Sequence, residues 1–320
     1  MAVQIAVIDD WQDVARGVVD WSVLDDIGQV TFLHDYPADR ETLVERLAPF
    51  DVICVMRERT SFDEGLLRRL PNLKLLLTGG LRNAALDLKT AAELGIQVCG
   101  TESYKHAAPE LTWALVMALS RNLVQEANAL RAGLWQQGLG GDLHGKTLAI
   151  LGLGSIGKRV AQFGQVFGMR VIAWSQNLSA EQAAEAGVTY VSKQQLFEQA
   201  DILSIHLVLG ERTRGLVDAQ ALGWMKPEAL LVNTARGPIV DEQALIDALR
   251  YKRLAGVALD VFAHEPLPAD HPFRTLDNVL ATPHVGYVSR QNYRQFYGQM
   301  IEALQAWAAG APIRLLTPTA

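Results

Sequence analysis

A glycine-rich turn, Gly152-Leu153-Gly154-Ser155-Ile156-Gly157, has the residue types and spacing that bind a phosphate group. It follows the apolar run Thr147–Leu151 and precedes the helical pattern Lys158–Phe167, which is the strand-turn-helix context that such a site requires. In that context Gly152 allows the tight turn, Gly154 lets backbone approach a pyrophosphate, and Gly157 lets the helix pack on the strand. The first amide groups of the helix add hydrogen-bond donors and a positive dipole end. The turn therefore predicts a dinucleotide site, the alternative being a glycine-rich turn with no ligand.

The end of the next predicted strand lacks the acidic residue typical of NAD sites. Roughly 20 residues beyond the turn, an Asp or Glu usually bonds the adenosine ribose hydroxyls, but here the stretch reads Ala173-Trp174-Ser175-Gln176-Asn177. Without a carboxylate at Ser175 nothing repels a 2′-phosphate, and no Arg or Lys of the stretch holds one. The sequence leaves NAD(H) and NADP(H) both open. NADPH is favoured if a cation from another segment reaches the phosphate.

Short apolar runs alternate with helical patterns along the chain, which is typical of an α/β fold with parallel sheets. The predicted strands of a first, small sheet are Val3–Ile8, Asp51–Val55, Leu73–Leu77 and Ile96–Cys99. Those of a second, six-stranded and doubly wound sheet are Thr147–Leu151, Arg170–Trp174, Asp201–Leu207, Ala229–Thr234, Gly256–Leu259 and Val279–Ala281. Ser61 and Glu64 have the spacing of a capping box for a helix that Pro71 ends.

A chain of 320 residues is long enough for two domains. A long helix is predicted from Glu110 to about Leu130, ended by Gly133, and the domain boundary belongs near it. The second sheet is complete before the last predicted helix, Ser289 to about Ala309, which can therefore return to cover the first sheet. We expect a discontinuous domain of residues 1–104 and 286–320, with a second domain of residues 105–285 inserted in it.

Composition and charge exclude several classes of function. The 29 Lys and Arg residues against 35 Asp and Glu give a net charge of −6, with no basic run, so nucleic acid is not expected as a partner. No run reaches the ~18 apolar residues of a membrane span and the N-terminus lacks a signal peptide pattern, so we expect a cytoplasmic protein with no membrane association. Cys54 and Cys99 are expected as buried thiols, and the histidines lack metal-ligand spacing, so no metal site is expected.

Three further segments follow strands of the second sheet, where an open parallel sheet places its ligand crevice. They are Asn233-Thr234-Ala235-Arg236-Gly237-Pro238, Ala258-Leu259-Asp260-Val261-Phe262-Ala263-His264-Glu265-Pro266 and Thr282-Pro283-His284-Val285-Gly286-Tyr287. With the turn at 152–157 they resemble the D-isomer-specific 2-hydroxyacid dehydrogenase family over nearly the whole chain. The resemblance implies a Rossmann cofactor domain inserted in a flavodoxin-like substrate domain, both doubly wound. It also implies an enzyme that interconverts a small 2-oxo acid and a D-2-hydroxy acid with NAD(H) or NADP(H).

Arg236, Glu265 and His284 match the catalytic residues of the family that the chain resembles. An arginine binds the carboxylate and the carbonyl of a 2-oxo acid at once through its planar fork. A histidine donates a proton to the oxygen on which charge develops as hydride reaches the carbonyl carbon. A carboxylate beside the imidazole orients it and favours its protonated form. Taken alone, Arg236 could be an exposed surface arginine and His284 a core histidine, and the combination is what indicates catalysis.

The resemblance also implies contacts with the cofactor and the substrate. For the cofactor it points to Ser155 and Ile156 with the three glycines, and to Ser175, Thr234, Ala235, Asp260 and Gly286. Asp260 matches an acid that contacts the nicotinamide carboxamide, or else it caps the turn. In the first domain, the amides of Gly80, Leu81 and Arg82 match those that receive the substrate carboxylate. The common family pattern has an Asp and an Asn where this chain has Ala84 and Ala85.

Two further expectations concern partners and substrate. The predicted helix Glu110 to Leu130 is apolar over more than one core-facing stripe, which indicates a homodimer through the cofactor domain, or else burial between the two domains. Arg57, Arg59 and Arg82 could line the first domain's side of the substrate cleft and bind a second acidic group. Alternatively Arg57 and Arg59 pair with Glu58, Asp63 or Glu64. An alternative function for the same fold is a nicotinamide-binding, redox-sensing regulator, whereas Glu265 argues against a formate dehydrogenase.

Overall fold

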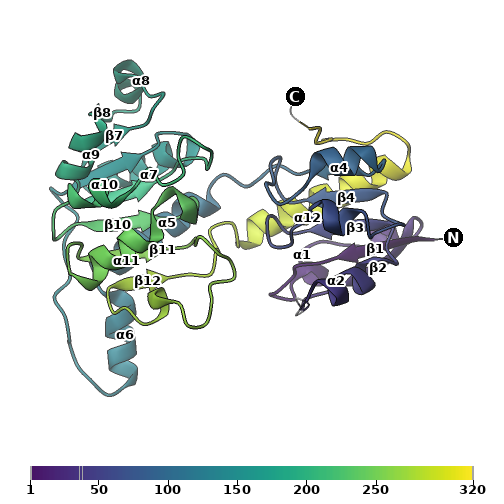
Figure 1. Cartoon of the computed structure of the whole chain (residues 1–320), viewed down its shortest axis with the longest axis horizontal. Coiled ribbons are helices and arrows are strands. Elements are labelled where there is room, and N and C mark those ends of the chain that lie inside the picture. The colour runs from purple at the N-terminus through teal and green to yellow at the C-terminus, as the bar shows by residue number, and fades with distance from the viewer. Residues whose placement is uncertain (1, 36, 38, 319–320) are drawn as a thin grey trace. The chain divides into compact units, whose positions relative to one another are not determined.

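The computed structural model describes residues 2–35, 37 and 39–318 and divides the chain into two compact units (Figure 1). The first unit combines Met1–Tyr104 with Val288–Ala320, and the second is formed by Lys105–Tyr287. The named strands of each unit form one sheet with parallel pairing, which confirms the predicted α/β class. Within the described residues, no helix is both long enough and apolar enough to cross a membrane.

The first unit is built around a five-stranded sheet in the order β2-β1-β3-β4-β5. Its strands are β1 (Val3–Val7), β2 (Gly28–Phe32), β3 (Val52–Val55), β4 (Leu75–Thr78) and β5 (Gln97–Gly100). Its helices are α1 (Ala15–Val18), η1 (Ser22–Leu24), α2 (Arg40–Leu47), α3 (Glu64–Leu67), α4 (Leu88–Glu93) and α12 (Arg290–Ala308). The four predicted strands are present. The sequence did not predict β2, because this edge strand is fully buried only at Gly28 and lacks an apolar run.

Helix α12 returns the C-terminal segment to the first sheet, as predicted. It packs against α1, β4 and β5, and its first turn is capped by the Ser289 hydroxyl, which accepts a hydrogen bond from the N–H of Asn292 at 3.3 Å. Phe296 is fully buried, and a Cβ added at Gly79 would lie 3.3 Å from its ring. The helix therefore supports the loop that follows β4.

The second unit contains a seven-stranded sheet in the order β12-β11-β10-β9-β6-β7-β8. Its strands are β6 (Thr147–Leu151), β7 (Arg170–Trp174), β8 (Thr189–Tyr190), β9 (Ile202–Ile205), β10 (Leu230–Asn233), β11 (Gly256–Leu259) and β12 (Val279–Ala281). Its helices are α5 (Ala107–Ser120), α6 (Leu123–Arg131), α7 (Ser155–Val166), α8 (Ala180–Glu185), α9 (Lys193–Gln199), α10 (Ala219–Gly223), η2 (Gly237–Ile239), α11 (Glu242–Arg250) and η3 (Pro272–Arg274). The prediction of six strands was one short, because β8 is an exposed, two-residue edge strand with no apolar pattern.

Two helix predictions were wrong in detail. The predicted helix from Glu110 to Leu130 is two helices, α5 and α6, which are separated where Asn122 has a left-handed backbone with φ of +51°. A continuous helix cannot contain a left-handed residue, so the direction of the chain changes there. The capping box at Ser61 is also wrong. Helix α3 is capped by Asp63, whose carboxylate accepts from the N–H of Leu66 at 2.9 Å.

The order of the second sheet places a crevice beside β6. In the sheet β6 lies between β7 and β9, so the chain leaves the carboxyl ends of β6 and β9 toward opposite sides. Open parallel sheets bind ligands at such a switch point, outside the carboxyl ends of the strands. The glycine-rich turn directly follows β6, at this position.

Candidate active site

The glycine turn is closed tightly at its first and third glycines and open at its second. Gly152 has φ of +102°, and a Cβ there would lie 2.9 Å from the carbonyl group of His206, just after β9. A Cβ at Gly157 would lie 2.1 Å from the carbonyl oxygen of Gly152, so only glycine lets α7 approach β6 this closely. At Gly154 nothing lies within 4 Å of an added Cβ. The turn thus leaves room for a ligand at its middle glycine.

The N-terminus of α7 offers donors to that ligand. Gly154 is its N-cap and no side chain caps the first turn. The first N–H groups of a helix have no partner within the helix, and the helix dipole makes this end attractive to an anion. Ser155 and Ile156, the first two residues of α7, are exposed. The turn and the helix end together fit the diphosphate of a dinucleotide.

The carboxyl end of β7 carries the neutral residues Ser175, Gln176 and Asn177, of which Gln176 and Asn177 are exposed. Gln176 Nε2 donates to the carbonyl oxygen of Arg212 at 3.1 Å, in the loop that follows β9. This hydrogen bond holds the β9 loop beside the end of β7.

Arg236, Glu265 and His284 follow three neighbouring strands of the second sheet. Because β11 pairs in parallel with both β10 and β12, the carboxyl ends of these strands are adjacent. Arg236 lies between β10 and η2, Glu265 in the loop after β11, and His284 in the loop after β12. Strand order therefore gathers at one edge residues that are far apart in sequence.

His284 and Glu265 form a hydrogen-bonded pair. The distance between His284 Nδ1 and Glu265 Oε2 is 2.5 Å, and the side chains are 23% and 33% exposed. Glu265 Oε1 accepts from the N–H of Phe262 at 2.8 Å, which fixes the carboxylate. Because Nδ1 is engaged, Nε2 is the ring nitrogen left for a ligand. His284 has φ of +52°, and such backbone outliers cluster at functional sites.

The turn that carries Arg236 is fixed by Asn233 and Gly237. The buried Asn233 donates from Nδ2 to the carbonyl oxygen of Arg236 at 3.0 Å and accepts from the N–H of Ala235 at 3.0 Å. A Cβ at Gly237 would lie 2.0 Å from the carbonyl carbon of Phe262, so this turn and the Glu265 loop touch only because residue 237 is glycine. Sequence reasoning gave these two residues no role, although Gly-Pro after a buried strand was a signal for such a turn.

The side chains of Thr234 and Asp260 make bonds within the second unit. The Thr234 hydroxyl lies 2.7 Å from that of Thr112 on α5. The Asp260 carboxylate accepts from three groups at 2.6 to 2.8 Å, namely the hydroxyl of Thr282 and the N–H groups of Val285 and Gly286. Burial raises the pKa of Asp260, and these hydrogen bonds oppose the shift. The contacts fit the expectation that Asp260 caps the turn.

The loop after β4 carries the residues expected to bind the substrate carboxylate. Gly80 is buried with φ of +94°, and its N–H donates to the Thr101 hydroxyl at 2.8 Å. The N–H groups of Leu81 and Arg82 donate to none of the described residues, and both side chains are exposed. The Gly80 N–H thus has a partner within the protein, and its contact with the substrate stays a prediction. Leu81 and Arg82 remain the candidate donors.

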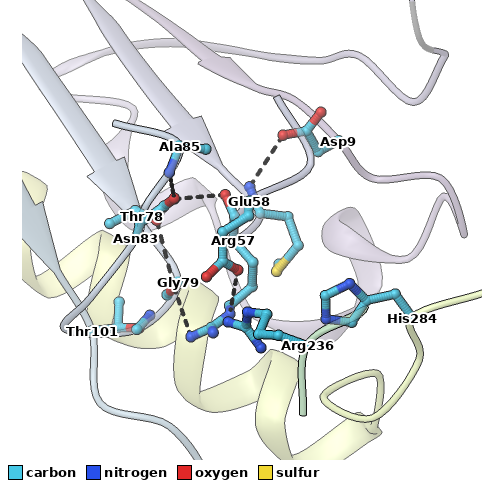
Figure 2. Close-up of polar contacts among 12 residues, drawn as sticks. Asp9, Arg57, Glu58, Thr78, Gly79, Asn83, Ala85, Thr101, Arg236 and His284 are labelled. Carbon is cyan, nitrogen blue, oxygen red and sulfur yellow. Dashed lines mark hydrogen bonds and ion pairs between the residues drawn. The ribbon is translucent and has the colours of Figure 1, made fainter. Parts of the chain in front are cut away.

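Asn83 joins this loop to the loop after β3, as Figure 2 shows. Its Nδ2 donates to the carbonyl oxygen of Arg57 at 2.7 Å and to the Thr78 hydroxyl at 2.9 Å, while its Oδ1 accepts from the N–H of Ala85 at 2.9 Å. The side chain is only 9% exposed. Sequence reasoning noted Ala84 and Ala85 as departures from the family pattern and missed that Asn83 supplies the polar contact here.

Arg57 and Arg59 have different surroundings. Arg57 Nε lies 3.4 Å from Glu58 Oε2, and its Nη1 donates to the carbonyl oxygen of Gly79 at 3.4 Å (Figure 2). Arg59 donates to the carbonyl oxygen of Asp9 and to the Tyr293 hydroxyl, and its guanidinium lies 4.4 Å from the ring centre of Trp11. Arg59 is therefore committed to contacts within the first unit. Pairing with Glu58, one of the alternatives from the sequence, is confirmed for Arg57.

A buried carboxyl group, Asp9, holds the loop after β3. It accepts from the Thr60 hydroxyl at 2.7 Å and from the N–H of Met56 at 3.4 Å, and it is 4% exposed. Burial raises the pKa of Asp9 to about 6, against the opposing effects of Thr60 and Arg59. No sequence pattern singled out this residue.

Comparison with known proteins gives three concordant findings. Residues 113–286 match the family model for the NAD binding domain of D-isomer specific 2-hydroxyacid dehydrogenases. The chain is 38% identical over 285 residues to a glyoxylate reductase of Aeropyrum pernix, covering 86% of this chain and 84% of that protein. It is 34% identical over 268 residues to a D-3-phosphoglycerate dehydrogenase of Methanocaldococcus jannaschii, covering 82% of this chain but only 50% of that longer protein. The crystal structure of a phosphoglycerate oxidoreductase from Vibrio cholerae superposes with a TM-score of 0.93 at 40% identity, covering 97% of this chain and 100% of that one.

The buried Asp9 predicts a pH dependence of stability. Its pKa of about 6 lies above that of an unfolded aspartate, so folding favours the protonated form, and its contribution to stability is lost as pH rises from about 4 to 6. Asp9→Asn keeps one acceptor oxygen and an amide that can donate to the Thr60 hydroxyl, and it does not ionise. We expect the variant to gain about 2 to 3 kcal/mol over the wild type between pH 4 and pH 7. Hydrogen exchange of the β1 and β3 amides measures the stability of this unit.

A matched control is Asp20→Asn, at an exposed carboxylate. Hydrogen bonds from Ser22 lower the pKa of Asp20, so its smaller contribution is lost as pH falls instead. A difference between Asp9→Asn and wild type that stays constant from pH 4 to pH 7 would show that Asp9 does not titrate in this interval.

Proposed function

The chain belongs to the D-isomer specific 2-hydroxyacid dehydrogenase family, and from that premise we propose that Arg236, Glu265 and His284 carry out its reaction. Membership makes the protein an NAD-dependent 2-hydroxyacid dehydrogenase. The observation that carries the proposal is the 2.5 Å bond between Glu265 and His284 at the edge of the sheet that also holds the glycine turn. We propose the second unit as the NAD(P)-binding unit and the first as the substrate-binding unit.

The proposed mechanism assigns each side chain one task. A nicotinamide dinucleotide, when bound, supplies the hydride. Arg236 binds the carboxylate and the carbonyl oxygen of the 2-oxo acid through its planar fork. His284 donates a proton from Nε2 to that oxygen as negative charge develops on it, and takes the proton back in the reverse direction. Glu265 holds Nδ1 and orients the ring.

The remaining site residues hold the two anions. The N–H groups at the start of α7 hold the diphosphate, and Gly154 leaves the room for it. The N–H groups of Leu81 and Arg82 receive the substrate carboxylate. The Asp260 hydrogen bonds fix the backbone of Val285 and Gly286, next to His284.

Substitution of the three residues separates their tasks. We expect His284→Asn to lower kcat by about 10² to 10⁴ with little change in KM, because proton donation matters only in the transition state. Arg236→Gln should raise KM and lower kcat, because the arginine also binds the ground state. Glu265→Gln should lower kcat with little change in KM, because the imidazole loses the carboxylate that orients it. Steady-state rates with glyoxylate and hydroxypyruvate over pH 5 to 9 measure all three.

His271→Asn is a matched control. His271 forms a second histidine-carboxylate pair in the same unit, with Glu242 at 3.2 Å, and it has no place in the proposed mechanism. Its rates should equal those of the wild type. Full activity of the His284→Asn variant would contradict the mechanism. If the folded wild type binds the cofactor but reduces no oxo acid, the result indicates the alternative function, a redox-sensing regulator.

For the substrate, we propose that Arg82 selects oxo acids with a second acidic group. Its guanidinium bonds none of the described residues, and it stands in the loop whose amides receive the substrate carboxylate. Because Arg59 is engaged in structural contacts, Arg82 is a better candidate than Arg59 among the cations noted in the sequence.

Arg82→Gln should therefore lower kcat/KM for phosphohydroxypyruvate by about tenfold to hundredfold and for glyoxylate by less than about threefold, since a charge-assisted hydrogen bond is lost only with the former. Arg69→Gln, which removes an arginine paired with Glu41 in the same unit, is the control. Equal losses for both oxo acids would exclude a role in selection.

For quaternary structure, we propose a homodimer through the α6 arm, defined as residues 123–139. The apolar face of α5 is used within the second unit, where Leu115, Val116 and Leu119 lie in the core. Helix α6 has no buried residue, and the arm exposes Leu130 by 61%, Trp135 by 74% and Leu139 by 96%. Large apolar side chains exposed together on one segment are typical of a protein interface.

Light scattering at micromolar concentration should give twice the mass of the chain for the wild type. The double variant Leu130→Glu, Trp135→Glu should give the monomer mass with an unchanged circular dichroism spectrum, because burial of two charges opposes association. Tyr251→Glu, at a residue 71% exposed on another loop of the same unit, should remain dimeric. A monomeric wild type excludes the proposal.

A further inference from the structure

The end of β7 is where a dinucleotide bound at the glycine turn presents its adenosine ribose. In such sites an acid at this strand end bonds the 2′-hydroxyl, and an arginine nearby accommodates a 2′-phosphate instead. This chain has Ser175, Gln176 and Asn177 there, which are hydroxyl and amide groups without charge. The next carboxylate, Glu181, lies in the first turn of α8, where it bonds the Ser179 side chain. A dianionic phosphate thus meets no carboxylate in the segment 175–180.

The loop after β9 brings a cation to this strand end. Gln176 Nε2 donates to the carbonyl oxygen of Arg212 at 3.1 Å, so the backbone of Arg212 is fixed beside Gln176. The loop itself is compact, because the Thr213 hydroxyl accepts from the N–H of Gly210 at 2.9 Å and donates to the carbonyl oxygen of Val208 at 2.7 Å. Its position is therefore set by bonds at both the strand end and the loop base.

The Arg212 side chain is available for a ligand. Arg212 is exposed, and its guanidinium forms no ion pair or hydrogen bond with a described residue, its neighbour Glu211 included. Other arginines of this chain do pair with nearby carboxylates, as Arg68 does with Glu64 and Glu93. The backbone of Arg212 is held in place, while its guanidinium pairs with none of the described residues. Such a side chain can bind a phosphate through two parallel hydrogen bonds.

We propose that Arg212, together with Ser175, Gln176 and Asn177, forms a subsite for the 2′-phosphate of NADP(H). The subsite rests on the proposed function, since it serves a dinucleotide at the glycine turn. It makes Arg212 a specificity-determining residue, and it gives the enzyme NADP(H) as a cofactor in addition to NAD(H). The cation thus comes from the loop after β9, whereas the residue that bonds the ribose usually lies at the end of β7.

Binding rather than turnover tests the subsite. Calorimetry with NADP⁺, NAD⁺, 2′,5′-ADP and 5′-AMP gives dissociation constants for the wild type and for Arg212→Gln. We expect the variant to lose about tenfold to hundredfold in affinity for NADP⁺ and 2′,5′-ADP, and less than about twofold for NAD⁺ and 5′-AMP. Raising the salt concentration should lower the affinity of the wild type for NADP⁺ more than its affinity for NAD⁺. The variant should not show this difference.

Two further variants sharpen the assignment. Arg214→Gln removes the same charge two residues away on the same exposed loop and should change neither affinity by more than about twofold. Ser175→Asp places a carboxylate at the end of β7. It should lower the affinity for NADP⁺ while preserving the affinity for NAD⁺. The proposal is overturned if Arg212→Gln affects both cofactors equally or neither, if Arg214→Gln reproduces its effect, or if the wild type prefers NAD⁺ over NADP⁺ more than about a hundredfold.

These outcomes are separable from those of the proposed function. If the wild type reduces oxo acids but Arg212→Gln binds NADP⁺ normally, only the subsite is wrong. If no oxo acid is reduced with either cofactor while Arg212→Gln selectively loses 2′,5′-ADP, the subsite stands and the proposed reaction is wrong.

Discussion

The hydrogen bond between Glu265 and His284 depends on the close approach of three loops at one edge of the second sheet. Gly237 lets the turn after β10 touch the backbone at Phe262, and the N–H of Phe262 in turn fixes the Glu265 carboxylate. The carboxylate then holds His284 Nδ1. A partly exposed ion pair contributes little by itself, since solvent screens it and ordering costs entropy. The pair therefore contributes to the orientation of the two side chains rather than to stability, because backbone contacts already orient each partner.

The two units use buried polar side chains in the same way. In the second unit Asn233 spans the Arg236 turn, and Asp260 bonds the Thr282 hydroxyl before His284 and the backbone N–H groups of Val285 and Gly286 after it. In the first unit Asn83 joins the loops after β3 and β4, and Asp9 holds the first of these. Buried polar groups are costly unless they are bonded, so a network of this kind has few alternative arrangements. Loops that would otherwise be mobile are thereby made firm enough to hold a site.

The sequence predicted the elements that bury continuous apolar runs and missed those defined by tertiary context. The strands of both sheets with such runs were found, whereas β2 and β8 lie at sheet edges and carry no such pattern. The break between α5 and α6 depends on a left-handed Asn122, which no hydrophobic periodicity reveals. Motif residues such as Gly152 and His284 were found because their chemistry requires a fixed spacing.

Residues that act through contacts distant in sequence could not be predicted. Arg59 meets Tyr293 and Asn83 meets Arg57 only after the chain has folded, so neither contact has a local signature. The engagement of the Gly80 amide by Thr101 is of the same kind. The motifs therefore indicated candidate site residues but not the bonds that hold them.

The charges at the carboxyl edge of the second sheet suit the anions that we propose to bind there. The chain carries a net charge of −6, and the proposed function places a diphosphate and a carboxylate at this edge. Its acids are accordingly neutralised in different ways. Asp260 is buried under three hydrogen bonds with its pKa raised, Glu265 is paired with His284, and the end of β7 has no acid at all. Because these carboxylates are occupied, the helix end of α7 and the side chains of Arg236 and Arg212 are the groups that we propose to attract an anionic ligand. The strand end at Ser175 has no carboxylate to bond the ribose, and it has none to repel the 2′-phosphate that we propose to bind there.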